Sequence, residues 1–292
     1  MPSNKLMSLE EAISTYIDNG DQVGIGGLSF WRKPMAACRE IIRQSKKDLT
    51  ICTFVGGLDV DTLIAGGCVS KVRASFVGME VFGMAPHYRK AVESGTVEVS
   101  EESEASIALG LRCAYLKVPF MPLKGMIGTD FAKVRKDIKQ FEDPLGSGTQ
   151  LMALPKIDLD ASIVHVNNCD EYGNANIEGA VWMDDDISKT AKKTIIICEK
   201  LVKMEDIIHL PRRAQIPMQS VSAVVEIPIG AHPTSCFPIY TFDPIHIKEY
   251  MKMDFNEYKH KYILNKTHAQ YLEAFGGAYT LIKKYGLGGN AE

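Results

Sequence analysis

The feature that most constrains this fold is a series of short apolar runs, rich in β-branched residues, that recur along most of the chain. The runs occupy residues 22–28, 49–55, 72–77, 97–99, 115–121, 161–166, 194–199 and 221–227. Strands that are buried on both faces of a sheet read as continuous apolar runs, whereas half-exposed strands alternate. Segments with helical spacing lie between the runs. The pattern therefore predicts an α/β fold with an open, mostly parallel sheet and helices on both faces.

Helix signals support this alternation. Helices are predicted near residues 8–17, 34–42, 60–65, 86–93 and 103–113. Ser8 and Glu11 have the spacing of a capping box, in which each residue satisfies a free backbone N–H of the other. Pro34 suits the first turn of a helix, where its missing N–H costs nothing.

Two changes in composition predict the domain organisation. Residues 124–150 are more polar than the runs around them, which predicts an excursion or a lid. After Asp243-Pro244 the chain becomes amphipathic and helical. We therefore expect one α/β domain over residues 1–242 and a C-terminal helical extension over residues 243–292 that packs on it.

The charge balance argues against a nucleic acid or a membrane as partner. The chain has 33 Lys and Arg against 36 Asp and Glu, a net charge of −3, and it has no block of five or six like charges. No apolar run approaches the roughly 20 residues that span a bilayer. The first residues lack the apolar core of a signal peptide. A cytoplasmic protein is expected.

The cysteines do not predict a disulfide framework or a metal site. There are seven, they are scattered, and none is spaced C-x-x-C. Free cysteine behaves as a small buried hydrophobe, so all seven are expected to be free thiols. No His pair or Cys/His cluster has zinc-ligand spacing, and no metal is expected.

The first predicted strand runs into a glycine-rich turn, Gly24-Ile25-Gly26-Gly27-Leu28-Ser29. Ser29 stands where a dinucleotide fingerprint needs its third glycine, so that motif is absent. Ligands bind at the carboxyl ends of strands in open parallel sheets, and Gly26 and Gly27 allow backbone N–H groups to approach an anion or a developing oxyanion. The alternative is a tight turn beneath packed helices, and the spacing alone favours neither.

Two cations follow this turn. Arg32 and Lys33 lie just before the helix that Pro34 begins. In that position they can hold a phosphate or a carboxylate, with help from the helix N-terminus. The alternative is two solvated surface charges.

Two carboxylates and a second glycine turn complete the candidate site. Glu80 and Glu104 each follow a predicted strand. A glutamate in the first turn of a helix is favoured by the helix dipole whatever its function, so a purely structural role for Glu104 stays open. Gly128 and Thr129 lie in a turn after an apolar run, where they either line a ligand or form a structural turn.

Other polar groups have structural explanations. Asp184-Asp185-Asp186 is expected to be a solvated helix entrance, and His232 is expected to be structural. The nucleophile elbow G-x-S-x-G and the phosphate-binding G-x-x-x-x-G-K-[ST] loop are absent, which excludes the commonest α/β hydrolases and nucleoside triphosphatases.

Taken in order, several stretches resemble the α subunits of heteromeric family I CoA-transferases, the group that includes glutaconate CoA-transferase. The stretches are 24–27 with 32–34, 118–122, 128–130, 157–165, 172–175 and 230–236. The resemblance covers roughly residues 8 to 285, and it lies in the ordered set rather than in any one piece.

This resemblance implies an active site at the interface with a β subunit of similar fold, in an αβ or α2β2 assembly. The substrates would be a small acyl-CoA and a carboxylate. Coenzyme A would enter as part of the substrate, and no cofactor would stay bound. In such transferases a glutamate attacks the thioester to give an acyl-glutamyl anhydride and then a glutamyl-CoA thioester. In the glutaconate enzyme that glutamate belongs to the β subunit.

A second resemblance points to a hydrolase. Residues 76–80, 85–89 and 102–104 are closer to the α subunit of the steroid-ring-opening hydrolase of the same fold, which cleaves a carbon–carbon bond in a cyclic diketone carried on CoA. Its essential glutamate corresponds to Glu104, which would act as a general base on water or hold a water for attack on a ring carbonyl. Such a hydrolase subunit is the alternative to the transferase, and a non-catalytic scaffold subunit is a second alternative, because one fold hosts several chemistries.

Overall fold

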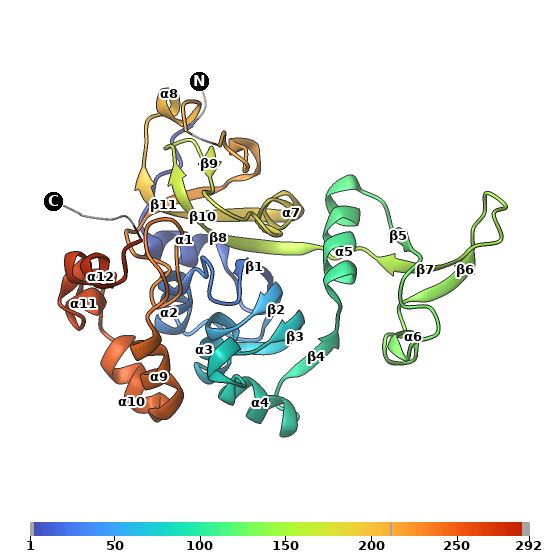
Figure 1. The fold of residues 1–292 in the computed structure, drawn as a ribbon, viewed down its shortest axis with the longest axis horizontal. Helices are drawn as coiled ribbons and strands as arrows, with labels where there is room; N and C mark the ends of the chain where they lie inside the picture. Colours follow the sequence, from blue (N-terminus) through green and yellow to red (C-terminus); the bar gives the residue numbers. More distant parts are fainter. Residues whose placement is uncertain (1–2, 211, 288–292) are drawn as a thin grey trace.

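The computed structural model describes residues 3–210 and 212–287, and its centre is one parallel sheet (Figure 1). Seven parallel strands lie in the order β11-β10-β8-β1-β2-β3-β4, and the short β9 pairs antiparallel with β8. The strands are β1 Gln22–Leu28, β2 Leu49–Gly56, β3 Val69–Val77, β4 Glu98–Glu101, β8 Leu159–Cys169, β9 Ala175–Asn176, β10 Ala191–Leu201 and β11 Ala223–Glu226. The predicted open, mostly parallel sheet is confirmed.

Helices cover both faces of this sheet, as predicted. They are α1 Leu9–Tyr16, α2 Met35–Arg43, α3 Leu58–Ala65, α4 Pro86–Glu93, α5 Glu104–Leu116, α7 Asp184–Thr190 and α8 Met204–Ile207, with the 3₁₀ turns η1 Glu80–Phe82 and η2 Met218–Ser220. Along β10, Ile195 and Ile197 join the core formed with α1 to α4, whereas Ile196 joins the core formed with α5 and α7. Successive side chains of a strand point to opposite faces, so one strand serves both cores.

The apolar run at residues 115–121 is not one strand, contrary to the prediction. Helix α5 continues to Leu116 and ends on Lys117, which adopts a left-handed conformation with φ of 58°. A new strand begins at Phe120 and belongs to a different sheet. Apolar residues at the end of a helix and at the start of the next strand read as one run in the sequence.

Residues 120–155 form a separate unit, here called the excursion, that stands away from the main sheet (Figure 1). Its three antiparallel strands lie in the order β5-β7-β6, with β5 Phe120–Leu123, α6 Phe131–Val134, β6 Lys139–Glu142 and β7 Gln150–Pro155. Ile138, Met152 and Leu154 form its own small core. The polar residues 124–150 lie inside this unit.

Between residues 243 and 287 the structure has four helices: α9 Pro244–Lys252, α10 Phe255–Tyr262, α11 His268–Glu273 and α12 Gly277–Tyr285. They pack on the same core as α1 to α4, largely through buried aromatic side chains. The guanidinium of Arg39 in α2 lies 3.7 Å from the ring centre of Tyr271 in α11, a cation–π contact that joins these two helices.

Acid is expected to destabilise this C-terminal packing. Burial, together with the neighbouring His232, lowers the pKa of His246 to about 3, and burial also lowers the pKa of His232. In the unfolded chain histidine titrates near 6.5, so below that pH the unfolded state binds more protons. Stability is therefore complete above about pH 6.5 and falls toward pH 3, by more than about 1 kcal/mol per pH unit.

Urea unfolding between pH 7 and pH 4 measures this loss. Asp243 lies 3.2 Å from His232. Burial alone would raise the pKa of the Asp243 carboxyl, but hydrogen bonds, first that from His232, hold this pKa below its usual value. Protonation of Asp243 therefore adds to the loss of stability at the acid end of the range. His246→Phe should flatten the slope between pH 6.5 and 4. A wild-type chain whose unfolding free energy stays constant over this range would contradict the prediction.

All seven cysteines are buried free thiols, as expected. Within the described ranges, no helix has both the length and the hydropathy that crossing a bilayer requires.

Candidate functional site

The strand order places the candidate site at the carboxyl edge of the main sheet. From the central β1, the strands β2, β3 and β4 extend to one side, whereas β8, β10 and β11 extend to the other. The order therefore reverses between β1 and β8. In open parallel sheets ligands bind in the crevice outside the carboxyl ends of the strands at such a point.

At the end of β1, the first glycine turn is closed by the chain itself. Gly26 and Gly27 are buried, and the Gly27 N–H donates to Asp184 Oδ1 at 2.6 Å. A side chain at Gly26 would overlap this carboxylate. The same carboxylate accepts from the buried Arg32 guanidinium at 2.5 Å through Oδ2. The Gly27 N–H is thus already hydrogen-bonded, and the charge of Arg32 is already neutralised.

Lys33 is also enclosed. Its side chain is fully buried, and its ammonium lies 3.1 Å from the buried Asp59 carboxylate and 2.9 Å from Thr53 Oγ1. Arg32 and Lys33 are therefore not solvated surface charges, which corrects that alternative. Arg32 neutralises Asp184 and Lys33 neutralises Asp59. These two buried ion pairs hold the segment that lies below the glycine turn.

The acidic run before β10 differs from its expected role as a solvated helix entrance. Asp184 is fully buried against Arg32 and Gly27, and Asp186 is 7% exposed and pairs with Arg112. Only Asp185 behaves as expected, in a partly exposed ion pair with Lys189.

The backbone at this edge is strained in several places. Ser29, Arg32, Glu80 and Trp182 have positive φ values, between 48° and 51°, although none is glycine. The Ser29 hydroxyl is buried and has no hydrogen-bond partner. Left-handed conformations of such residues cost about 1–3 kcal/mol each and cluster at functional sites. Their gathering at one edge supports the placement of the site.

Large apolar side chains are exposed on the segments at and just beyond the ends of the strands, and next to α7. They are Trp31, Phe76, Val81, Met84, Trp182 and Phe237. The Asn167 side chain of β8 donates to the Phe237 backbone, and the Trp31 backbone pairs with Ser235, so these segments meet at the reversal point. Apolar side chains exposed on adjoining segments favour a surface that binds a partner or a ligand.

Glu80 and Glu104 reach the same edge. Glu80 begins η1 just after β3, and Glu104 is the first residue of α5 just after β4, which is paired parallel with β3. Both side chains are exposed. Ser103 caps α5, so Glu104 has the helix-start position that the dipole favours and is also free to meet a ligand.

Gly128 and Thr129 lie elsewhere. They form an exposed turn between β5 and α6 in the excursion, with φ of 80° at Gly128. The structure therefore does not place them against the glycine turn of β1.

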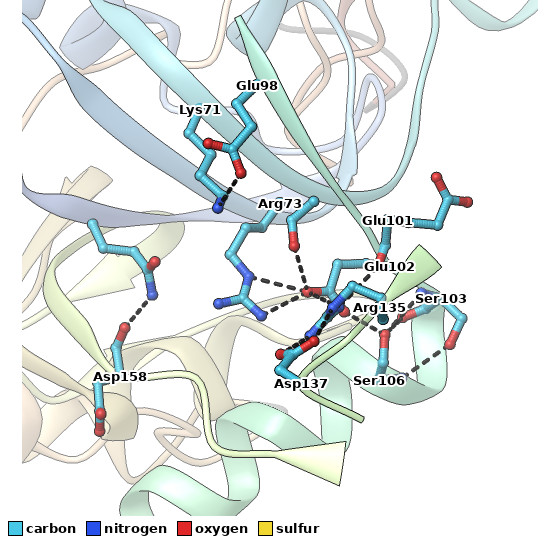
Figure 2. A network of polar contacts seen from close by, with 12 residues as sticks. Lys71, Arg73, Glu98, Glu101, Glu102, Ser103, Ser106, Arg135, Asp137 and Asp158 are labelled. Atoms are coloured by element: carbon cyan, nitrogen blue, oxygen red, sulfur yellow. Dashed lines mark hydrogen bonds and ion pairs between the residues drawn. The ribbon is translucent and has the colours of Figure 1, made fainter. Parts of the chain in front are cut away.

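Sequence reasoning missed a buried carboxylate two residues before Glu104. Glu102 lies inside a cluster with Arg73, Arg135 and Ser106, which Figure 2 shows at close range. The Arg135 guanidinium holds the pKa of the neighbouring Asp137 carboxyl below its usual value. The only local signal was the serine pair 103 and 106, which forms a capping box on α5.

One group of side chains has metal-binding atoms close together. His165, Glu199 and Cys236 are all buried, and their ligand atoms lie within 4.8 Å of one another. However, Glu199 already accepts hydrogen bonds from His165 at 2.7 Å, from the Ile229 N–H at 2.5 Å and from the Tyr240 hydroxyl. Burial raises the pKa of the Cys236 thiol well above its usual value. These contacts describe a hydrogen-bonded cluster that joins β8 and β10 to the segment after β11.

Comparison with known proteins gives a consistent result. Over 289 residues the chain is 37% identical to an uncharacterized protein of Archaeoglobus fulgidus, covering 96% of this chain but only 64% of that protein. It is 32% identical to a glutaconate CoA-transferase subunit of Acidaminococcus fermentans, covering 94% of this chain and 92% of its relative. It is also 32% identical to a cholesterol ring-cleaving hydrolase IpdA subunit of Rhodococcus jostii, covering 78% and 80%.

The fold comparison agrees. The crystal structure of glutaconate coenzyme A-transferase from Acidaminococcus fermentans superposes with a TM-score of 0.91 at 31% identity, covering 98% of this chain and 96% of that one. Residues 6–227 match the family described as Coenzyme A transferase. This match spans the main sheet, both helical layers and the excursion, and the chain therefore belongs to the coenzyme A transferase family.

Proposed function

We propose that this chain is one subunit of a two-subunit CoA-transferase that acts on a small acyl-CoA and a carboxylate. The observation that carries the proposal is the end-to-end similarity to the glutaconate CoA-transferase subunit of Acidaminococcus fermentans, which covers 94% of this chain and 92% of its relative. The similarity thus extends over nearly the whole length of one such subunit.

The second subunit would have a similar fold and cover the carboxyl edge of the main sheet. Trp31, Trp182 and Phe237 are exposed there, and aromatic side chains are enriched in the buried centres of protein interfaces. Assembly as αβ or α2β2 would enclose the thioester between the subunits. CoA enters this pocket as part of the substrate.

In the proposed reaction a glutamate of the partner attacks the thioester carbonyl, and the CoA thiolate leaves. The CoA thiolate opens the resulting anhydride at the glutamyl carbonyl, which releases the first carboxylate and leaves a glutamyl-CoA thioester. The acceptor carboxylate attacks that thioester to give a second anhydride and CoA thiolate, and the thiolate then attacks the acceptor's acyl carbonyl, which yields the new acyl-CoA and regenerates the glutamate. This chain contributes the wall at Glu80 and Glu104, with Gly128 and Thr129 of the excursion as further substrate contacts. The buried residues behind this surface hold the backbone in place; they are Gly26, Gly27, Arg32 and Lys33.

Trapping of the covalent intermediate tests the proposal. The chain should gain activity only when it is co-expressed with a β-like chain. Incubation of that complex with acetyl-CoA, followed by borohydride reduction and peptide mass mapping, should locate a modified glutamate on the partner. Full turnover by this chain alone would refute the proposal of a two-subunit enzyme.

A second candidate function is hydrolysis of a carbon–carbon bond in a CoA ester. It is favoured by the exposed Glu104 at the strand edge, since a carboxylate beside a CoA ester can act as a general base on water. The similarity to the cholesterol ring-cleaving hydrolase subunit supports it. In that case borohydride should trap no adduct, and product formed in ¹⁸O-labelled water should contain one labelled oxygen.

A further inference from the structure

An ionic cluster with a buried centre joins the excursion to the main sheet (Figure 2). At its centre the Glu102 side chain is fully buried. It accepts hydrogen bonds from Arg73 Nε at 3.0 Å and Nη2 at 2.7 Å, and from the Ser106 hydroxyl at 2.5 Å. Arg135 Nη1 lies 2.7 Å from its Oε1 atom. Asp137 accepts two hydrogen bonds from Arg135, at 2.8 and 2.7 Å.

Glu102 is not available for chemistry itself. Both of its oxygens already accept hydrogen bonds, and its buried side chain offers no face to a substrate. The two positive charges of the cluster are balanced by Glu102 and Asp137. Bidentate arginine–carboxylate pairs are strong and directional. A cluster whose charges are balanced in this way fixes the positions of the backbone segments that carry its side chains.

The geometry that it holds is the turn between β4 and α5. The Ser106 hydroxyl donates to Glu102 and also accepts from the Ser103 N–H at 2.8 Å, while the Ser106 N–H donates back to Ser103 Oγ at 3.0 Å. Glu104 lies inside this loop of contacts, and its own side chain is exposed. The carboxylate at Glu102 thereby fixes the first turn of the helix that presents Glu104.

Arg135 brings the excursion into this arrangement. It follows α6 directly, and it also donates to the Glu101 carbonyl at 2.8 Å. Among the described residues, its pair with Glu102 is the one ion pair between the excursion and the rest of the chain. The turn at Gly128 and Thr129 precedes α6, so Arg135 connects that turn with the start of α5.

We propose that Arg135 is a positioning residue, which acts through Glu102 to hold Glu104 and the excursion in one fixed relation. The inference rests on the second candidate function, in which Glu104 faces the CoA ester and acts as a general base on water. Displacement of a reacting group by about 1 Å can cost about 100-fold in rate. Loss of Arg135 is therefore expected to lower kcat, and this decrease should depend on the presence of Glu104.

The test is a double-mutant cycle in the co-expressed complex, with acetyl-CoA as the probe and the hydrolysis of its thioester, which also needs a base on water, as the readout. Arg135→Ala should lower kcat about 10- to 100-fold and change KM less than about threefold. In a Glu104→Gln background the same change should cost less than about twofold. Arg135→Lys keeps the positive charge but cannot form the bidentate hydrogen bonds of a guanidinium, so it should recover part of the rate that Arg135→Ala loses. Lys133→Ala, which removes an exposed ion pair in α6, should change nothing.

Hydrogen exchange supplies a readout that is independent of activity. The Ser106 and Ile107 amides donate to Ser103 in the cap of α5, and in Arg135→Ala they should exchange about tenfold faster. An equal loss of activity in both Glu104 backgrounds, or unchanged exchange at these amides, overturns the proposal. If Glu104→Gln alone leaves hydrolysis unchanged, the proposed role of Glu104 fails, while the exchange rates still decide whether Arg135 orders the turn.

Discussion

Replacing Asp184 with alanine is expected to destabilise the chain by about 3–5 kcal/mol, because it leaves a buried guanidinium without its counter-charge. Arg32 is 2% exposed, and Asp184 is its single carboxylate partner among the described residues. The same change removes the acceptor of the Gly27 N–H. Urea unfolding of Asp184→Ala and wild type at pH 7 measures the difference in unfolding free energy.

The next residue provides a matched control. Asp185 belongs to the same helical turn, but its ion pair with Lys189 is partly exposed and of i,i+4 type, so Asp185→Ala should cost no more than about 0.5 kcal/mol. The double change Arg32→Met with Asp184→Leu removes both charges and should be less harmful than Asp184→Ala alone. Equal stabilities of the two alanine variants would show that the buried pair contributes nothing.

Asp184 and Asp185 show what a local sequence pattern can predict and what it cannot. Three consecutive aspartates before a helix are typical of a solvated start, and at Asp185 this prediction holds. Asp184 differs only because Arg32 lies opposite it, and those residues are 152 positions apart in the chain. A local pattern describes the helix but not the partner that folding brings to it. For the same reason Lys33 could not be recognised as the partner of Asp59.

The main sheet was predictable because its signal is local. Strands such as β10 are buried on both faces, and continuous apolar runs report this directly. The start of α5 was predictable too, since a glutamate after a serine cap suits a helix N-terminus. The cluster around Glu102 was not predictable, because its arginines come from β3 and from the excursion, and nothing in either segment marks them as partners.

Burial therefore separates the candidate site residues into two groups. Gly26, Gly27, Arg32 and Lys33 lie under the edge and are bound to the chain's own carboxylates or backbone. Glu80 and Glu104 lie on the edge with exposed side chains. At this edge only the second group can meet a substrate without rearrangement of the core, and Glu104 is the member whose helix start is fixed by hydrogen bonds from Ser103 and Ser106.

Glu104→Gln is expected to separate hydrolysis of a CoA ester from transfer. Hydrolysis needs a base to activate water, and loss of a general base costs about 10²–10⁴-fold. Glutamine keeps the shape of the side chain and its place at the helix start but cannot accept the proton. Transfer through a partner glutamate needs no water, so its kcat should change by less than about threefold. In the co-expressed complex, release of free CoA from acetyl-CoA measures hydrolysis, and formation of the acceptor's CoA ester measures transfer.

Glu101→Gln is the matched control for this experiment. Glu101 is an exposed carboxylate at the end of β4, three residues before Glu104, and its replacement should leave both rates unchanged. A selective loss of hydrolysis in Glu104→Gln alone assigns the base to this residue. If hydrolysis and transfer fall together in that variant, Glu104 serves the shared pocket and not the activation of water. If neither rate falls, the carboxylate is only a favourable first residue of α5, and the water-activating base must come from the partner subunit.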